Sequence, residues 1–124
     1  MIRTISTTLM QLGVSPAMKG YFYLQYGLYK VYGNPALGYA VFKELYPMIA
    51  SHFNESRANV ERCIRHSIKC AWEIGDVDLY RELFKSSFED GDRRPANGKF
   101  IRVLSKYLRS LNLEQQDYSF PKMR

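Results

Sequence analysis

Apolar residues recur every three or four positions along most of this 124-residue chain, which is the period of an amphipathic α-helix. Glycine, asparagine and proline separate the periodic stretches, as is typical of helix ends and turns. The pattern therefore predicts an all-α domain, a six- or seven-helix bundle. The expected helices are Thr4–Leu12, Ala17–Tyr32, about Ala36–Leu45, a short helix from Tyr46, Ser56–Trp72, about Val77–Ser86 and Asn97–Leu111.

Residues 1–112 are expected to form one folded domain. A hydrophobic share of 46% and an aromatic share of 15% supply enough apolar surface for a core. Residues 113–124 lose the apolar period and are expected to be a loose C-terminal tail.

The stretch Tyr46–Trp72 reads as a short helix, a tight turn and a long helix, which predicts a helix-turn-helix within the bundle. Pro47 suits the start of the short helix, because its missing N–H would be unpaired there in any case. Asn54 tolerates the left-handed conformation that a sharp helix exit needs, and Ser56 is a good N-cap for the long helix. The inward face of the short helix consists of Ile49, Ala50 and Phe53.

The long helix carries an apolar stripe and a charged stripe one residue further on. The apolar stripe is Val60, Ile64, Ile68 and Trp72, and the charged stripe is Arg57, Glu61, Arg65 and Lys69, with Arg62 beside it. Four basic residues and one acid give this helix a net charge of +3, half of the chain's +6. Such a helix can bury one face and present the other to the DNA major groove. A solvated charged face is the competing interpretation.

The residue types on the charged face suit base recognition. Arg62 and Arg65 have the planar fork that matches two acceptors on guanine, and Glu61 can accept from the amino group of cytosine. An intrahelical ion pair with Arg57 or Arg65 would explain Glu61 equally well. The residues expected to contact the DNA backbone or flank these positions are Ser56, Arg57, Asn59, His66 and Lys69.

Four separated stretches of the chain together resemble one known protein family in their order and spacing. They are LGVSPAMKGYFYL, KELYPMIASHFN, VERCIRHSIKCAWEIGDVD and RPANGKFI. They resemble the effector domain of stage 0 sporulation protein A, a sporulation response regulator, from about Leu12 to about Arg109. The resemblance implies an all-helical bundle around a helix-turn-helix. It also implies binding to a short DNA box, often as tandem copies on which a homodimer could form, to activate or repress transcription.

Carried over by position, Glu61, Arg62 and Arg65 match the family's base-contacting acid and arginines, and His66 matches an adjacent histidine. Asn59 departs from the pattern, which usually has an arginine directly before the valine of this helix. Family members also carry an N-terminal receiver domain, so this chain is expected to be either an excised fragment or a stand-alone effector.

Two further surfaces follow from these considerations. The resemblance implies that the helix after Gly75 contacts RNA polymerase sigma factor. A plain packing helix is the simpler interpretation. The residues expected to be exposed for this contact are Asp78, Arg81 and Glu82. Basic side chains near the start of the last helix suit a DNA phosphate, or belong to a solvated loop; they are Arg93, Arg94 and Lys99.

The remaining features favour no other function. Cys63 and Cys70 are two helical turns apart, too far for a disulfide, and with His66 they lack the usual zinc spacing, so no metal or cofactor is expected. No enzyme motif is evident, and His52 is expected to pack or to contact a phosphate. No apolar run spans a membrane, and a cytoplasmic, DNA-associated protein is expected. The alternative is a helical protein-interaction module that binds sigma factor or another regulator, with weak or non-specific DNA binding.

Overall fold

The computed structural model describes residues 1–85, 94–114 and 118–121, and over these residues the chain is helical with no strand. The prediction of an all-α bundle is confirmed. No helix in these ranges is both long and apolar enough to cross a membrane. The elements are α1 (Ile2–Gln11), α2 (Lys19–Gly33), a 3-10 helix η1 (Pro35–Tyr39), a π-helix η2 (Val41–Leu45), α3 (Tyr46–Phe53), α4 (Arg57–Ile74), α5 (Val77–Leu83) and α7 (Asn97–Ser110).

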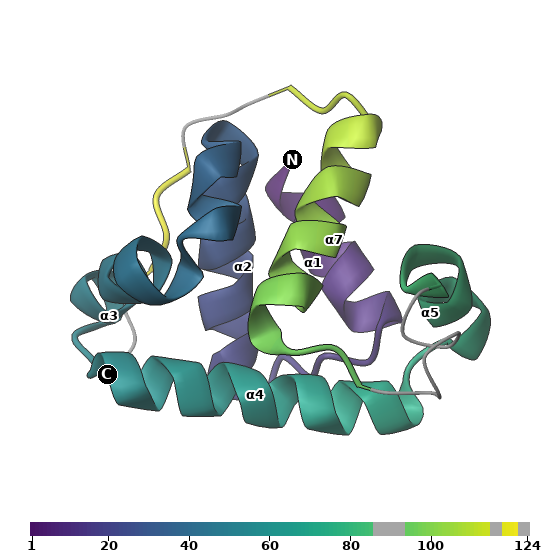
Figure 1. The fold of residues 1–124 in the computed structure, drawn as a ribbon, viewed down its shortest axis with the longest axis horizontal. Coiled ribbons are helices and arrows are strands. Elements are labelled where there is room, and N and C mark those ends of the chain that lie inside the picture. Colours follow the sequence, from purple (N-terminus) through teal and green to yellow (C-terminus); the bar gives the residue numbers. More distant parts are fainter. Residues whose placement is uncertain (86–93, 115–117, 122–124) are drawn as a thin grey trace.

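Helix α4 lies along one edge of the bundle, and the other helices are arranged on its inner side (Figure 1). α2 and α7 meet it at steep angles, α1 packs beside α2, α3 lies at the N-terminal end of α4 and α5 at its C-terminal end. The core between these helices is built from aliphatic and aromatic side chains with no exposed surface, among them Leu9, Leu24, Val60, Ile64, Phe100 and Leu104. Burial of this apolar surface fixes which face of α4 remains outside.

Helices α2 and α4 are in close contact at Gly20. A Cβ atom at this glycine would lie 2.1 Å from Ser67 Oγ and 2.4 Å from the Cys63 carbonyl oxygen, so no side chain fits between the helices. Gly20 and Ser67 are both buried. This contact sets the distance of α4 from the bundle.

The C-terminal end of α4 is held by the connection between α1 and α2. The Tyr80 hydroxyl donates to the Leu12 carbonyl oxygen over 2.5 Å, and the Asp76 N–H donates to the Gln11 carbonyl oxygen over 3.3 Å. Gly75 ends α4 at a point where a Cβ atom would lie 2.2 Å from the Leu12 carbonyl oxygen. Both ends of α4 are thus anchored to other elements, because its N-terminal end is fixed by the turn after α3.

That turn has the features expected from its sequence. Asn54 adopts the left-handed conformation with φ 52°, and the Glu55 N–H donates to the Ala50 carbonyl oxygen over 2.9 Å. The Ser56 side chain caps α4 by accepting from the Asn59 N–H over 3.1 Å. Pro47 lies in the first turn of α3. Helix entry, turn and helix start therefore follow from local side-chain chemistry.

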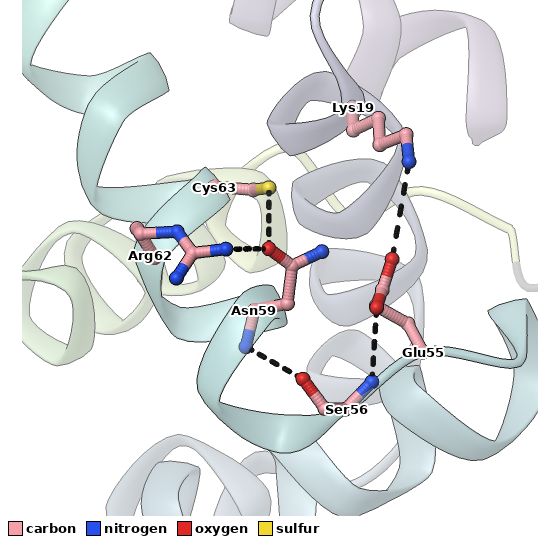
Figure 2. Close-up of polar contacts among 6 residues, drawn as sticks. All are labelled: Lys19, Glu55, Ser56, Asn59, Arg62 and Cys63. Atoms are coloured by element: carbon pink, nitrogen blue, oxygen red, sulfur yellow. Dashed lines mark hydrogen bonds and ion pairs between the residues drawn. The ribbon is translucent and has the colours of Figure 1, made fainter.

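Glu55 connects the turn to α2 (Figure 2). One carboxylate oxygen accepts from the Ser56 N–H over 3.1 Å, and the other lies 3.9 Å from Lys19 Nζ. The Ser56 N–H, as the largest cause, lowers the pKa of Glu55 below its usual value of 4.5. The ionised carboxylate therefore supports the start of α4.

The segment expected to form one helix at about Ala36–Leu45 is different. It consists of η1 and η2, with a break at Ala40 (φ −133°, ψ 39°), so this prediction is wrong. The reason is tertiary: the Gly38 carbonyl oxygen accepts from Arg102 Nη1 over 3.0 Å, which draws this segment onto α7. This tertiary bond satisfies the Gly38 carbonyl without a helical N–H partner, so the segment does not depend on a continuous α-helical hydrogen-bond pattern.

Part of the expected loose tail packs on the bundle. The Leu113 carbonyl oxygen accepts from the Tyr32 hydroxyl over 2.8 Å, and the Tyr118 N–H donates to the Tyr29 hydroxyl over 3.0 Å. The Phe120 ring is buried against Tyr26, with centroids 5.2 Å apart. Three tyrosines of α2, Tyr26, Tyr29 and Tyr32, therefore hold the described part of the C-terminal segment.

Replacing Gly20 by alanine should lower the free energy of unfolding by at least about 2 kcal/mol, because the new methyl group meets the α4 backbone. Gly27→Ala is the matched control in the same helix, since its Cβ would lie 3.4 Å from Ile49 Cδ1, an ordinary contact. It should stay within about 1 kcal/mol of the parent chain, helped by the higher helix propensity of alanine. Urea unfolding measures both, and equal effects would contradict the close approach of α2 and α4.

The lowered pKa of Glu55 predicts a pH-dependent contribution to stability. Because the folded pKa lies below the unfolded value of 4.5, the contribution is complete well above pH 4.5 and is lost as the pH falls through 4.5 toward the folded pKa. The stability difference between the parent chain and Glu55→Gln should therefore shrink on acidification. Urea unfolding from pH 7 to pH 3 measures it, with the exposed Glu73→Gln as control. A pH-independent difference for Glu55→Gln would refute the assignment.

Candidate nucleic-acid interface

The outer face of α4 is cationic. Its exposed residues in the middle of the helix are Arg62, Arg65, His66 and Lys69. Val60, Ile64 and Ile68 are buried on the opposite face, and Trp72 is partly buried against the core. The two stripes predicted from the sequence are therefore separated as expected. This exposed face is continuous with the N-terminal end of the helix, where Ser56 and Arg57 are also exposed.

The two central arginines differ in their partners. Arg65 Nη1 forms an ion pair with Glu61 Oε1 at 3.0 Å, four residues earlier. Arg62 Nη2 instead donates to the neutral Asn59 Oδ1. The charge of Arg65 is thus compensated within the helix, whereas Arg62 keeps its full positive charge. An exposed pair such as Arg65–Glu61 contributes only about 0–1 kcal/mol and is readily exchanged for a ligand.

Arg94 joins this face from the segment before α7. It lines a hollow of about 530 Å³ beside α4, and the other lining residues are Arg62, Cys63, Arg65, His66 and Lys69. A concave surface with this concentration of cationic side chains attracts polyanions. Of the basic residues predicted near the last helix, Arg93 lies outside the described residues. Lys99 is half-buried in the first turn of α7 and is not among the residues that line this hollow.

Asn97 fixes the start of α7 against α4. Its Nδ2 donates to the Glu61 carbonyl oxygen over 3.1 Å and to the Tyr46 hydroxyl over 3.0 Å. Burial, as the largest cause, raises the pKa of Tyr46, and the hydrogen bond from Asn97 opposes this shift. Arg94 reaches the α4 face because α7 starts here. Sequence reasoning missed this contact, since an asparagine at a helix start carries no signal of a distant partner.

Phe42 is a second contributor that sequence reasoning missed. Its ring is more than half exposed, and the Arg57 guanidinium carbon lies 4.4 Å from the ring centroid. This cation–π contact holds the Arg57 side chain at the N-terminal end of α4. Phe42 also lines a second hollow of about 520 Å³ with Glu61, Arg65 and Arg94. Its exposure could not be predicted, because the segment was expected to be an α-helix.

The residues predicted for sigma factor lie elsewhere. Asp78, Arg81 and Glu82 are exposed on α5, which begins beyond the C-terminal end of α4 (Figure 1). The Asp76 side chain caps α5 by accepting from the N–H groups of Asp78 and Leu79 over 3.0 and 3.2 Å. This surface is therefore separate from the cationic face of α4.

The cysteines and histidines make structural contacts. Cys63 and Cys70 are free thiols, and Cys70 Sγ lies 3.9 Å from His66 Nε2. No group of three His, Cys, Asp or Glu side chains suited to a metal ion occurs among the residues that the structure describes. His52 packs on the Tyr26 ring with centroids 4.7 Å apart, and its Nε2 lies 3.2 Å from the Phe120 carbonyl oxygen. Packing is therefore the role of His52 in this structure.

Comparison with known protein families identifies the family of this chain. A family model described as Sporulation initiation factor Spo0A C terminal matches residues 5–108, which is nearly all of the helical bundle and includes the whole of α4. This is a family of DNA-binding effector domains in transcription regulation, and it is not an enzyme family. The chain belongs to the Spo0A C-terminal family of DNA-binding effector domains.

Proposed function

We propose that this chain is a sequence-specific transcription regulator that inserts α4 into the DNA major groove. The observation that carries the proposal is the cationic outer face of α4, on which Arg62, Arg65 and Lys69 surround a hollow completed by Arg94. The membership in a DNA-binding family supports double-stranded DNA as the partner.

In this proposal α3, the turn and α4 act as a helix-turn-helix. α3 packs against α4, and the small side chain of Ala50 on α3 is buried. An α-helix with its side chains is about 10–12 Å wide, which matches the width of the major groove, about 12 Å. The 18 residues of α4 extend over about 27 Å, so only its N-terminal half would lie deep in the groove.

The proposed base contacts are made by Arg62, Arg65 and Glu61. Each arginine can donate two parallel hydrogen bonds to guanine, and Glu61 can accept from cytosine. The Arg65–Glu61 ion pair supports this division of roles, because the two side chains lie on successive turns of one helix face and can separate toward neighbouring bases. An exposed ion pair costs little to break.

The proposed phosphate contacts surround these base contacts. They are made by Ser56, Arg57, His66, Lys69, Arg94 and Lys99, with Arg93 as a further candidate outside the described residues. The hollow at Arg94 supports a phosphate there, since cationic side chains from two segments converge on it. The Phe42 contact supports a fixed position for Arg57.

Two protein partners are proposed in addition to DNA. The exposed Asp78, Arg81 and Glu82 on α5 would meet RNA polymerase sigma factor, at a distance from the DNA-binding face. Tandem DNA sites would bring two copies of the chain together as a homodimer. Both follow from the resemblance described above, and the separation of α5 from the cationic face of α4 is compatible with simultaneous DNA and protein binding.

Arginine and lysine replacements on α4 should have different effects on DNA binding. Arg62→Ala and Arg65→Ala should each weaken binding to a selected duplex by about 1–3 kcal/mol and relax the preference at one base pair. Lys69→Ala should weaken binding to all duplexes alike and reduce the salt slope by about one. Fluorescence titrations with selected and scrambled duplexes at several salt concentrations measure these quantities.

The same titrations can overturn the assignment. If Arg62→Ala and Lys69→Ala weaken selected and scrambled DNA by the same factor, the division into base and phosphate contacts is wrong. If the parent chain itself binds every duplex equally, in a salt-dependent manner, the helical protein-interaction module becomes the better account.

A further inference from the structure

Asn59 is the residue of α4 with the most constrained polar surroundings. Its N–H donates to the Ser56 cap over 3.1 Å, and its side-chain oxygen accepts from Arg62 Nη2 and from Cys63 Sγ, the latter at 3.8 Å (Figure 2). It is half-buried, whereas Arg62 is exposed. Asn59 is thus bonded to the helix start through its N–H and to the exposed Arg62 through its side-chain oxygen.

The amide of Asn59 can take only one orientation in these surroundings. Its oxygen faces the two donors, Arg62 and Cys63. Its nitrogen lies on the side of the Glu55 carboxylate, whose pKa the Asn59 amide helps to lower. A flipped amide would place an oxygen toward a carboxylate and a nitrogen toward a guanidinium, so it is disfavoured on both sides. Glu55 is in turn held by the Ser56 N–H and lies near Lys19 of α2.

We propose that Asn59 is a specificity-determining residue that acts through Arg62, by holding its guanidinium in the orientation that reads one base pair. This inference rests on the proposed function. The sequence predicted that Asn59 contacts or flanks the DNA backbone. Its hydrogen bond with Arg62 points to a different role. Arg62 is the base-contacting residue in this account, and Asn59 is a positioning residue.

The hydrogen-bonding capacity of Arg62 permits this arrangement in the DNA complex. A guanidinium has five N–H groups, and the Asn59 oxygen occupies one of those on Nη2. Enough N–H groups remain for two parallel bonds to guanine. Because the amide is neutral, Arg62 also keeps its full attraction to DNA, unlike Arg65, whose charge is compensated by Glu61.

Pre-ordering of Arg62 reduces the entropy that must be lost on binding. Asn59→Ala should therefore lower the affinity for the duplex selected by the parent chain about 3- to 10-fold. The affinity for a scrambled duplex and the salt slope should remain unchanged, because no charge is removed. The relaxed base pair should be the one relaxed in Arg62→Ala, and Asn59→Ala added to Arg62→Ala should have no further effect.

The experiment is a set of titrations with the parent chain and the variants Asn59→Ala, Arg62→Ala and the double variant. The probes are the selected duplex, its single-base-pair replacements and a scrambled duplex. Asn34→Ala removes an exposed amide at the end of α2 and is the matched control, with an unchanged affinity expected. Thermal unfolding checks that Asn59→Ala is folded, which is expected because alanine favours a helix.

Each alternative result overturns the inference in a recognisable way. Equal weakening of selected and scrambled DNA would make Asn59 a backbone contact. Relaxation at a base pair other than that of Arg62→Ala would make Asn59 a direct reader of its own base. An unchanged selectivity would show that Arg62 needs no support. Failure of the proposed function is distinct, because then the parent chain itself would show no preference among duplexes.

Discussion

The close approach of α2 and α4 at Gly20 is the constraint on which the rest of the structure depends. With no side chain between the helices, the backbone of α4 at Cys63 and the Ser67 side chain lie directly on α2. This fixes both the depth of α4 in the bundle and its rotation, so that Ile64 and Ile68 are buried and Arg62 and Arg65 are exposed. The identity of the exposed face is therefore a consequence of core packing and requires no interaction with DNA.

On the exposed face, local hydrogen bonds determine how the cations are presented. Arg57 is held by the Phe42 ring, Arg62 by the Asn59 amide and Arg65 by the Glu61 carboxylate, and each partner is different in charge or polarity. The three arginines therefore differ in how far their charge is compensated by a neighbour, although they are the same residue type on the same helix. Such differences give a basic helix the means to combine phosphate attraction with base selection.

Much of the fold could be predicted because it depends on local chemistry. Pro47, Asn54 and Ser56 specify the helix start, turn and cap, and the apolar stripe of α4 specifies its buried face. The parts that could not be predicted depend on partners far away in the sequence. Arg102 binds the Gly38 carbonyl in the segment before α3, which departs from a regular α-helix, and Asn97 joins α3, α4 and α7. Residue types on α4 predicted the candidate site, but not the pairing of Arg62 with Asn59.

The most direct test of the central claim is a binding titration of this chain with a family-type DNA box and with a scrambled duplex, each at two salt concentrations. If the outer face of α4 reads bases, the box should be preferred by about 10³-fold or more, and the preference should persist at both salt concentrations. Equal, salt-sensitive binding to the two duplexes would contradict the account, since it would mean that only the positive charge of the surface is used.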